Sequence, residues 1–269
     1  MYIRGITNET LQVQKQLASL AMSIEQTQNK HPKLHKFLAD SGLCSRRQGE
    51  ILISSGSVTV NGQKPKLGER IDPFKDVIKL NGKRVQSKNL TQTTFMVNKP
   101  KGFTCSNHDE HADKLIFELL EKKHAKLRLF CAGRLDVDSE GLVILTNDGN
   151  LSHQLTHPSR KIQKKYQVEL NRLLEKDDFQ QLINGFENEG EFLKLDEIRF
   201  RGGSPIGSLK MEVVMGHGKK REIRRAFGAM KYRVKKLRRV AVGKLFLDGL
   251  PLGGYRELHR KEIDLLLSR

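Results

Sequence analysis

Short apolar stretches with two different spacings follow each other along this chain, and their irregular order is the strongest constraint on its fold. Some stretches are apolar at every second position, as half-buried strands are, and others at every third or fourth position, as helix faces are. The strand-like residues are Tyr166, Val168 and Leu170, then Leu209, Met211 and Val213. The helix-like residues are Leu115, Ile116, Leu119 and Leu120, then Phe179, Leu182 and Ile183, then Ile223, Phe227 and Met230. This mixture predicts an α+β fold with a largely antiparallel sheet rather than a regular βαβ array.

A smaller module precedes these stretches, over residues 33–92. Its first helix is indicated by the apolar spacing from Leu34 to Leu38, and its second begins at Ser45, with Gln48 placed for a capping box. Two short β-branched stretches then each end at an Asn-Gly pair, which is a turn signal. The module is therefore predicted to be two short helices packed on a small sheet.

The chain divides into three predicted parts. Residues 1–32 are polar and rich in Gln, and we expect a flexible extension there. Residues 33–92 form the small module, and residues 93–269 form the larger domain. A chain of 269 residues is long enough for two such domains.

The positive charge of the chain is concentrated in two segments. The formal net charge is +18. Residues 33–92 hold 12 basic and 5 acidic residues, and residues 210–244 hold 13 basic and 2 acidic residues. Such a field attracts a polyanion and makes its binding depend on salt. Nucleic acid is the predicted partner, and a solvated basic surface is the alternative.

Several other classes of protein are disfavoured. The 3 cysteines have no CxxC spacing, which argues against a disulfide scaffold or thiolate zinc site and suits a reducing compartment. His153 and His157 could share a metal on a helix, but no third ligand is near in sequence, so we expect no metal. No Walker, GxGxxG, HExxH or GxSxG motif occurs. With no run of about 18 apolar residues and no secretory signal, we expect a cytoplasmic protein without a membrane span.

The segment Gly133-Arg134-Leu135-Asp136, which continues to Gly141 and Leu142, is the strongest candidate for chemistry. Two glycines bracket an Arg and an Asp, and an apolar strand follows. Such a loop holds one carboxylate next to a cation. From these residues alone it is either an active-site loop or a turn with a local ion pair.

The chain resembles RNA pseudouridine synthases of the branch typified by RsuA and RluB, in which an S4 RNA-binding domain precedes the catalytic domain. The resemblance covers about residues 33–260. Leu38 to Arg47 carry the S4 pattern. The catalytic motifs follow in the order of the family: Lys99-Pro100-Lys101-Gly102, Gly133-Arg134-Leu135-Asp136, His157-Pro158-Ser159-Arg160 with Lys165-Tyr166, Arg221-Glu222-Ile223-Arg224-Arg225, and Leu250 to Leu258.

The resemblance implies a redox-neutral isomerisation without a cofactor. The bond from ribose C1′ to uracil N1 breaks, the base rotates, and C5 attaches to C1′. Asp136 would be the ionised carboxylate, either as nucleophile or as base, and Arg224 would be the guanidinium that keeps it charged. Ile223 would pack under the uracil, and Tyr166 would stack on it and help to remove the C5 proton. Arg134 would support the nucleotide once it is flipped out of the RNA.

The remaining candidate residues are basic and would contact RNA phosphates. They are Lys219, Lys220, Arg221 and Arg225 in the catalytic domain, and Lys36, Arg46 and Arg47 in the S4 module. The predicted substrate is ribosomal RNA, with the large subunit favoured over the small subunit. A non-catalytic RNA-binding or ribosome-assembly factor is the alternative from another class. We expect a monomer, because an asymmetric RNA supplies the ordering surface.

Overall fold

The computed structural model describes residues 31–86, 91–200 and 208–268. The chain forms two compact units, residues 1–91 and 92–269, and each is described here by itself. The predicted N-terminal extension lies outside the described residues except for His31 and Pro32. No helix in the described ranges is long and apolar enough to cross a membrane.

The first unit is a helix pair with a small antiparallel sheet, as predicted. Its elements are α2 (Leu34–Asp40), α3 (Arg46–Ser54), β1 (Val58–Val60), β2 (Ile78–Leu80) and β3 (Lys83–Arg84). Leu34, Ile53 and Val58 are buried in one apolar core, which joins both helices to the sheet. The Ser45 hydroxyl caps α3 by accepting a hydrogen bond from the backbone N–H of Gln48 at 3.1 Å.

The two Asn-Gly pairs both form tight turns with positive φ, but only the second joins adjacent strands. Asn81 and Gly82 have φ of 50° and 78° and connect β2 to β3. Asn61 and Gly62 have φ of 51° and 83°, and the chain then returns to bridge Val60. Strand β1 instead pairs with the more distant β2. The local turn signal was therefore correct, whereas the strand partner depends on contacts far along the chain.

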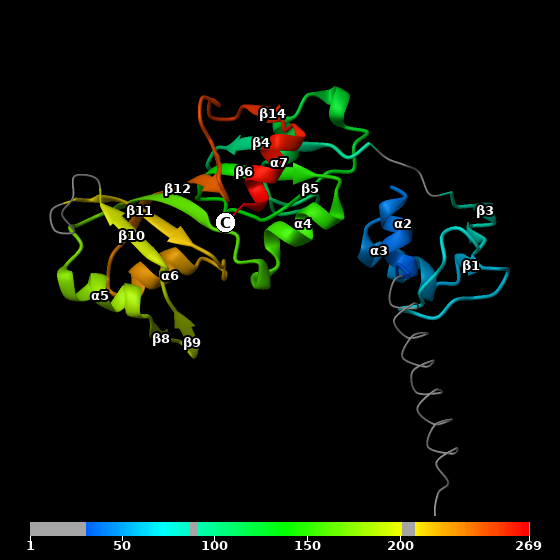
Figure 1. The fold of residues 1–269 in the computed structure, drawn as a ribbon, viewed down its shortest axis with the longest axis horizontal. Coiled ribbons are helices and arrows are strands. Elements are labelled where there is room, and N and C mark those ends of the chain that lie inside the picture. The colour runs from blue at the N-terminus through cyan, green and yellow to red at the C-terminus, as the bar shows by residue number, and fades with distance from the viewer. Residues whose placement is uncertain (1–30, 87–90, 201–207, 269) are drawn as a thin grey trace, which may run out of the picture. The chain divides into compact units, whose positions relative to one another are not determined.

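The second unit is built on a mixed sheet that runs in the order β10-β11-β7-β12-β6-β4-β14, with β13 on β12 and β5 on β6 (Figure 1). Between the named strands of this sheet, every pairing is antiparallel except that of β12 with β6. Its strands are β4 (Thr94–Lys99), β5 (Phe130–Cys131), β6 (Glu140–Thr146), β7 (Lys164–Leu170), β10 (Glu197–Phe200), β11 (Lys210–Met215), β12 (Val234–Val242), β13 (Leu245–Phe246) and β14 (Tyr255–Glu257). The predicted α+β class with a largely antiparallel sheet is confirmed.

Helices cover both faces of this sheet. Along β4 the side chains alternate, so that Phe95 and Val97 enter one core and Met96 enters the other. Apolar residues of α5 and α6 complete the first core, and those of α4 and α7 complete the second. These helices are α4 (Gly149–Thr156), α5 (Lys176–Asn184), α6 (Glu222–Ala229) and α7 (Arg260–Leu267). Burial of apolar side chains on both faces holds the central strands in place.

Some elements differ from the sequence predictions. The helix predicted from Leu115 to Leu120 is only a 3₁₀ turn, Ile116–Leu119, and two further 3₁₀ turns are Lys122–His124 and Pro158–Arg160. After β6 the chain enters α4 directly, because the Asp148 carboxylate accepts two backbone N–H groups at the start of that helix. A separate hairpin of β8 (Phe186–Asn188) and β9 (Glu191–Leu193) was not predicted.

Candidate active site

The candidate carboxylate lies in residues 133–141, here called the Asp136 loop, between β5 and β6. The loop begins at Gly133 with φ of 88° and ends at Gly141 with φ of 111°. A Cβ atom at Gly141 would lie 2.2 Å from the carbonyl oxygen of Arg239 on β12. Glycine is therefore required where the loop enters the sheet, because a side chain there would collide with backbone.

Arg239 ties the two ends of the Asp136 loop together. It is only 3% exposed, and its Nε donates to the carbonyl of Leu142 at 2.7 Å. Its Nη1 donates to the carbonyl of Arg134 at 3.3 Å. A buried guanidinium needs such acceptors, because an unsatisfied buried charge is costly. The side chain thus holds the backbone on both sides of Asp136.

Arg221 brings positive charge to the carboxylates of the Asp136 loop. Its Nη1 lies 3.9 Å from Oδ2 of Asp136, whose side chain is about one-third exposed. It also makes two hydrogen bonds to the Asp138 carboxylate, at 2.9 and 3.2 Å. The backbone of Arg221 is left-handed, with φ of 51°, immediately before α6. Arg221 was predicted to contact phosphate, but in this structure it faces the loop.

Arg224 binds the same loop, but not at the position predicted. Its Nη2 donates to the carbonyl of Asp138 at 3.0 Å and to the Ser139 hydroxyl at 3.3 Å. Its Nε lies 3.3 Å from an Asp138 carboxylate oxygen, and its Nη1 donates to the carbonyl of Val234. Among the described residues it forms no ion pair with Asp136 within 4.0 Å. Arg221, and not Arg224, is thus the arginine within 4.0 Å of the Asp136 carboxylate, since both terminal nitrogens of Arg224 donate elsewhere.

The arginine charges around the loop shift the pKa of the Asp138 carboxyl group. Partial burial would raise the pKa of the Asp138 carboxyl, but the hydrogen bond from Arg221 and the charge of Arg224 outweigh it and lower that pKa. The hydrogen bond to Asp138 raises the pKa of Arg221. Burial lowers the pKa of Arg224, whereas the charges of Asp138 and Asp136 oppose that shift. Both arginines therefore interact electrostatically with Asp136 as well as with Asp138.

Lys99 is a further cation near the Asp136 loop. It ends β4 and is fully buried, with its Nζ donating to the carbonyl of Pro100 at 2.9 Å. Burial lowers the pKa of its ammonium group, and the charges of Cys105, Asp136 and Asp138 oppose that shift. The sequence analysis placed Lys99 in a family motif but assigned it no role.

Tyr166 and Ile223 lie in the same apolar core as Leu135 of the Asp136 loop. Tyr166 is 9% exposed and pairs in the sheet with Arg239 of β12 and with β11 on its other side. Ile223 is in the first turn of α6. The structure therefore brings the Asp136 loop, β7 and the start of α6 together, as the sequence motifs predicted.

Comparison with known proteins identifies the family. The family described as RNA pseudouridylate synthase matches residues 93–229, which is about half of the chain, and the S4 domain matches residues 33–78. The chain belongs to the RNA pseudouridine synthase family. It is 35% identical over 238 residues to "Ribosomal large subunit pseudouridine synthase B" of Vibrio vulnificus, covering 87% of this chain and 74% of that protein.

Two other relatives agree with this assignment. An "Uncharacterized RNA pseudouridine synthase" of Aquifex aeolicus is 34% identical, covering 88% of this chain and 94% of that protein. A solved structure described as "Crystal structure of pseudouridylate synthase" is 30% identical, with a TM-score of 0.63, and the match covers 87% of this chain and 99% of that one. The chain is therefore a pseudouridine synthase family enzyme with an S4 RNA-binding domain.

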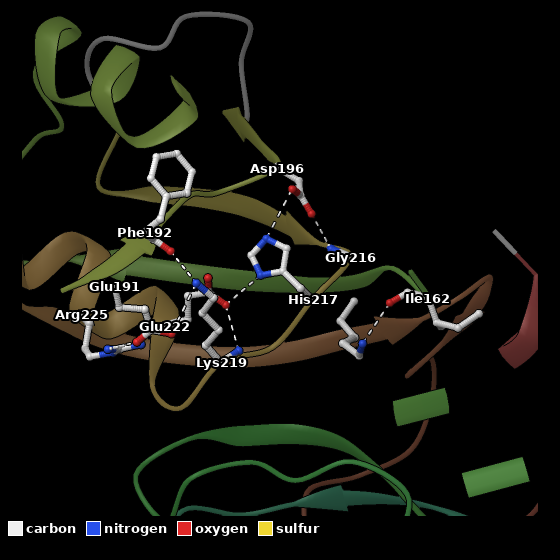
Figure 2. Close-up of polar contacts among 10 residues, drawn as sticks. Ile162, Glu191, Phe192, Asp196, Gly216, His217, Lys219, Glu222 and Arg225 are labelled. Atoms are coloured by element: carbon white, nitrogen blue, oxygen red, sulfur yellow. Dashed lines mark hydrogen bonds and ion pairs between the residues drawn. The ribbon is translucent and has the colours of Figure 1, made fainter. Parts of the chain in front are cut away.

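Apart from Arg221, the basic residues predicted to bind RNA in the synthase domain fall into two groups. Arg134 and Lys220 are exposed, and the described residues provide neither with an ion pair. Lys219 and Arg225 both pair with Glu191 of the β8–β9 hairpin (Figure 2). The first group is available to an anion in this structure, whereas the two cations of the second group already share one carboxylate.

The predicted basic residues of the S4 domain also differ from one another. Arg46 and Arg47 are exposed at the start of α3, without an ion pair to any described residue. Lys36 instead pairs with Asp40 one turn along α2, at 2.5 Å. Exposed arginines at a helix start lie against the positive end of the helix dipole, so an external anion would stabilise them.

Three residues that contribute to the site were not singled out from the sequence. Asp138 lies in the motif itself, and only its pairing with two arginines distinguishes it from a surface carboxylate. Arg239 is one of several basic residues on β12. Its position two residues after Leu237, on the same buried face of the strand, was the signal that the sequence offered. Glu191 carried no signal, because its partners are 28 and 34 residues further along the chain.

Within the described ranges, no three His, Cys, Asp or Glu side chains are grouped to hold a metal ion.

Proposed function

We propose that this chain isomerises a uridine of large-subunit ribosomal RNA to pseudouridine, with Asp136 as the catalytic carboxylate. The convergence of Arg221 and Arg224 on the Asp136 loop is the observation that carries this proposal, because it places two guanidinium groups beside the carboxylate that the motif requires. The similarity to a relative named for the large ribosomal subunit supports the choice of substrate.

The proposed reaction needs an everted uridine, because a stacked base cannot be reached. Asp136 acts on the ribose and glycosidic bond, as nucleophile or as base, while the base rotates. C5 then bonds to C1′, the C5 proton is lost, and N1 gains a proton, so the reaction is redox neutral. Ile223 packs under the uracil and Tyr166 stacks on it, in keeping with the apolar core that both share. Arg134 supports the everted nucleotide, and its exposure in the loop supports that role.

The S4 domain supplies a second RNA contact in this proposal, through Arg46, Arg47 and Lys36. Two linked sites increase the avidity for an RNA that spans both. Lys220 adds a phosphate contact beside α6. A cytoplasmic location, a monomeric state and the absence of a cofactor remain predictions from the sequence.

The test is tritium release from C5-labelled uridine in ribosomal transcripts, since isomerisation replaces the C5–H bond by a bond to carbon. Release from a large-subunit transcript and none from a small-subunit transcript is the expected result. Release from the small-subunit transcript alone would correct the substrate. Tight binding of RNA without release from either transcript, or from ribosomal precursors, would instead favour the non-catalytic assembly factor.

Changing Arg46 and Arg47 together to Ala should weaken RNA binding and flatten its dependence on salt. Each lost phosphate contact reduces the slope of log K against log salt by about 0.7 to 0.9, so a reduction of roughly 1.5 is expected. Fluorescence anisotropy at several salt concentrations measures both quantities. The matched control is Lys83→Ala with Arg84→Ala on β3, which removes the same charge from exposed positions of the same domain. Equal effects of the two double variants would show a response to net charge and would contradict a contact at α3.

A further inference from the structure

The β8–β9 hairpin places a carboxylate against two cations of the basic motif. Glu191, at the start of β9, accepts a hydrogen bond from Nη1 of Arg225 on α6 at 2.6 Å. Its other carboxylate oxygen lies 3.3 Å from Nζ of Lys219. Figure 2 shows both cations turned toward the hairpin. One acidic residue thus pairs with two residues that the sequence analysis assigned to RNA phosphates, and the three side chains together keep a net charge of about +1.

The backbone that carries the two cations is held independently of Glu191, and the Lys219 ammonium group also donates to the carbonyl of Phe192 on the hairpin. The backbone N–H of Lys219 donates to the carboxylate of Glu222 at 2.9 Å, and Glu222 is 4% exposed. The ring of His217 contacts the same carboxylate at 2.9 Å and lies 3.5 Å from Asp196 (Figure 2). These contacts anchor the turn before α6, so the backbone at Lys219 and at Arg225 keeps its place when Glu191 leaves.

The cation pair lies beside the candidate active site. Arg224 and Arg225 are consecutive residues on α6, so their side chains project about 100° apart. Arg224 contacts the Asp136 loop, and Arg225 contacts the hairpin. A nucleotide chain that enters the active site along this helix would therefore pass the Lys219 and Arg225 side chains.

We propose that Lys219 and Arg225 form a subsite for a backbone phosphate of the RNA, and that Glu191 occupies this subsite in the free protein until the phosphate displaces it. The inference rests on the proposed function, since the ligand is the backbone of the substrate RNA. Carboxylate and phosphate oxygens accept the same charge-assisted hydrogen bonds from guanidinium and ammonium groups. Glu191 is therefore a residue that lowers RNA affinity, and it does so for every RNA that reaches this helix.

The competing anion limits binding to bulk RNA. A strongly basic chain binds any polyanion through phosphate contacts, which carry no sequence information. In this proposal, Lys219 and Arg225 contact an RNA phosphate only after that phosphate has displaced Glu191. This cost is the same for every RNA, so an RNA that is also held at the S4 domain and at the everted uridine stays bound, whereas the weaker binding of an RNA held only by charge is weakened further. The hydrogen bond from Arg225, with that from Lys219, holds the pKa of Glu191 below its usual value despite desolvation, so the carboxylate is charged at neutral pH.

The experiment compares Glu191→Gln with Glu187→Gln in the full chain. The second change removes the same charge from the same hairpin, at an exposed carboxylate that pairs with no described cation. Binding to a labelled large-subunit ribosomal RNA transcript is measured by anisotropy over a range of salt. We expect E191Q to bind about three- to tenfold more tightly at low salt and to show a steeper salt dependence, because two surface ion pairs no longer compete. E187Q should bind within about twofold of the wild type, since no pair is lost.

A third comparison separates displacement from a structural role. In a chain that already carries Lys219→Ala and Arg225→Ala, the change E191Q should produce no gain in affinity. The proposal is overturned if E191Q binds like the wild type, if E187Q gains as much as E191Q, or if the gain persists without the two cations. A lower thermal midpoint of E191Q with unchanged affinity would show that Glu191 only fastens the hairpin. If the wild type released no tritium from any transcript, that result would count against the proposed function. The binding differences between the variants test only the role of Glu191.

Discussion

Asp136→Asn removes tritium release from C5-labelled uridine while the protein stays folded and keeps its affinity for RNA. The amide is nearly isosteric but uncharged, so it can serve neither as nucleophile nor as base, and the rate should fall roughly a thousandfold or more. The fold should persist, because the loop is held by Arg239 and by the contacts of Arg221 and Arg224 at Asp138, not by the carboxylate of Asp136. Single-turnover tritium release and anisotropy measure the two quantities.

Asp138→Asn is the matched control for this experiment, two residues along the same loop. It weakens the pairs with Arg221 and Arg224 but leaves the proposed catalytic group in place. We expect a smaller loss, of roughly 10- to 100-fold, through misplacement of the loop. Release by the Asp136 variant at the wild-type rate would exclude Asp136 as the catalytic group. A larger loss at Asp138 than at Asp136 would transfer the assignment to Asp138.

The features that the sequence predicted well are those set by local physics. Alternating apolar residues identified β7 and β11, since each has one face in the core. The two glycines of the motif placed Asp136 in a loop, because both adopt positive φ there. The family resemblance, and not local physics, predicted that this loop meets the start of α6. The predictions made from the residues themselves each depended on a few consecutive positions.

The features that could not be predicted depend on contacts between distant segments. Arg221 and Arg224 are both basic and three positions apart, so their spacing did not decide which would approach Asp136. The left-handed backbone at Arg221 and the hydrogen bond from Arg224 to Val234 decide it, and both arise from packing. The parallel pairing of β12 with β6 likewise joins segments about 100 residues apart. Glu191 meets Lys219 and Arg225 only because the hairpin folds back on α6.

Gly141→Ala should destabilise the synthase domain severely, by more than about 4 kcal/mol, and abolish tritium release. The added methyl group would lie 2.2 Å from the carbonyl oxygen of Arg239 and 2.8 Å from its backbone nitrogen. Neither strand can yield easily, because β12 pairs with β7 on its other side and Gly141 opposes Arg239 in the sheet. Chemical denaturation followed by circular dichroism measures the loss.

Gly102→Ala is the control that measures the cost of backbone strain in an alanine with positive φ, without a collision. Gly102 also has positive φ, at 86°, but a Cβ there would meet nothing within 4 Å. Its replacement should cost only about 1 to 2 kcal/mol, the price of a left-handed alanine. The difference between the two variants therefore reports the close approach of the Asp136 loop to β12. If both variants lose the same free energy of unfolding, the Asp136 loop does not end against Arg239. The side chain of Arg239 could then not hold the carbonyls on either side of Asp136, as it does in this structure.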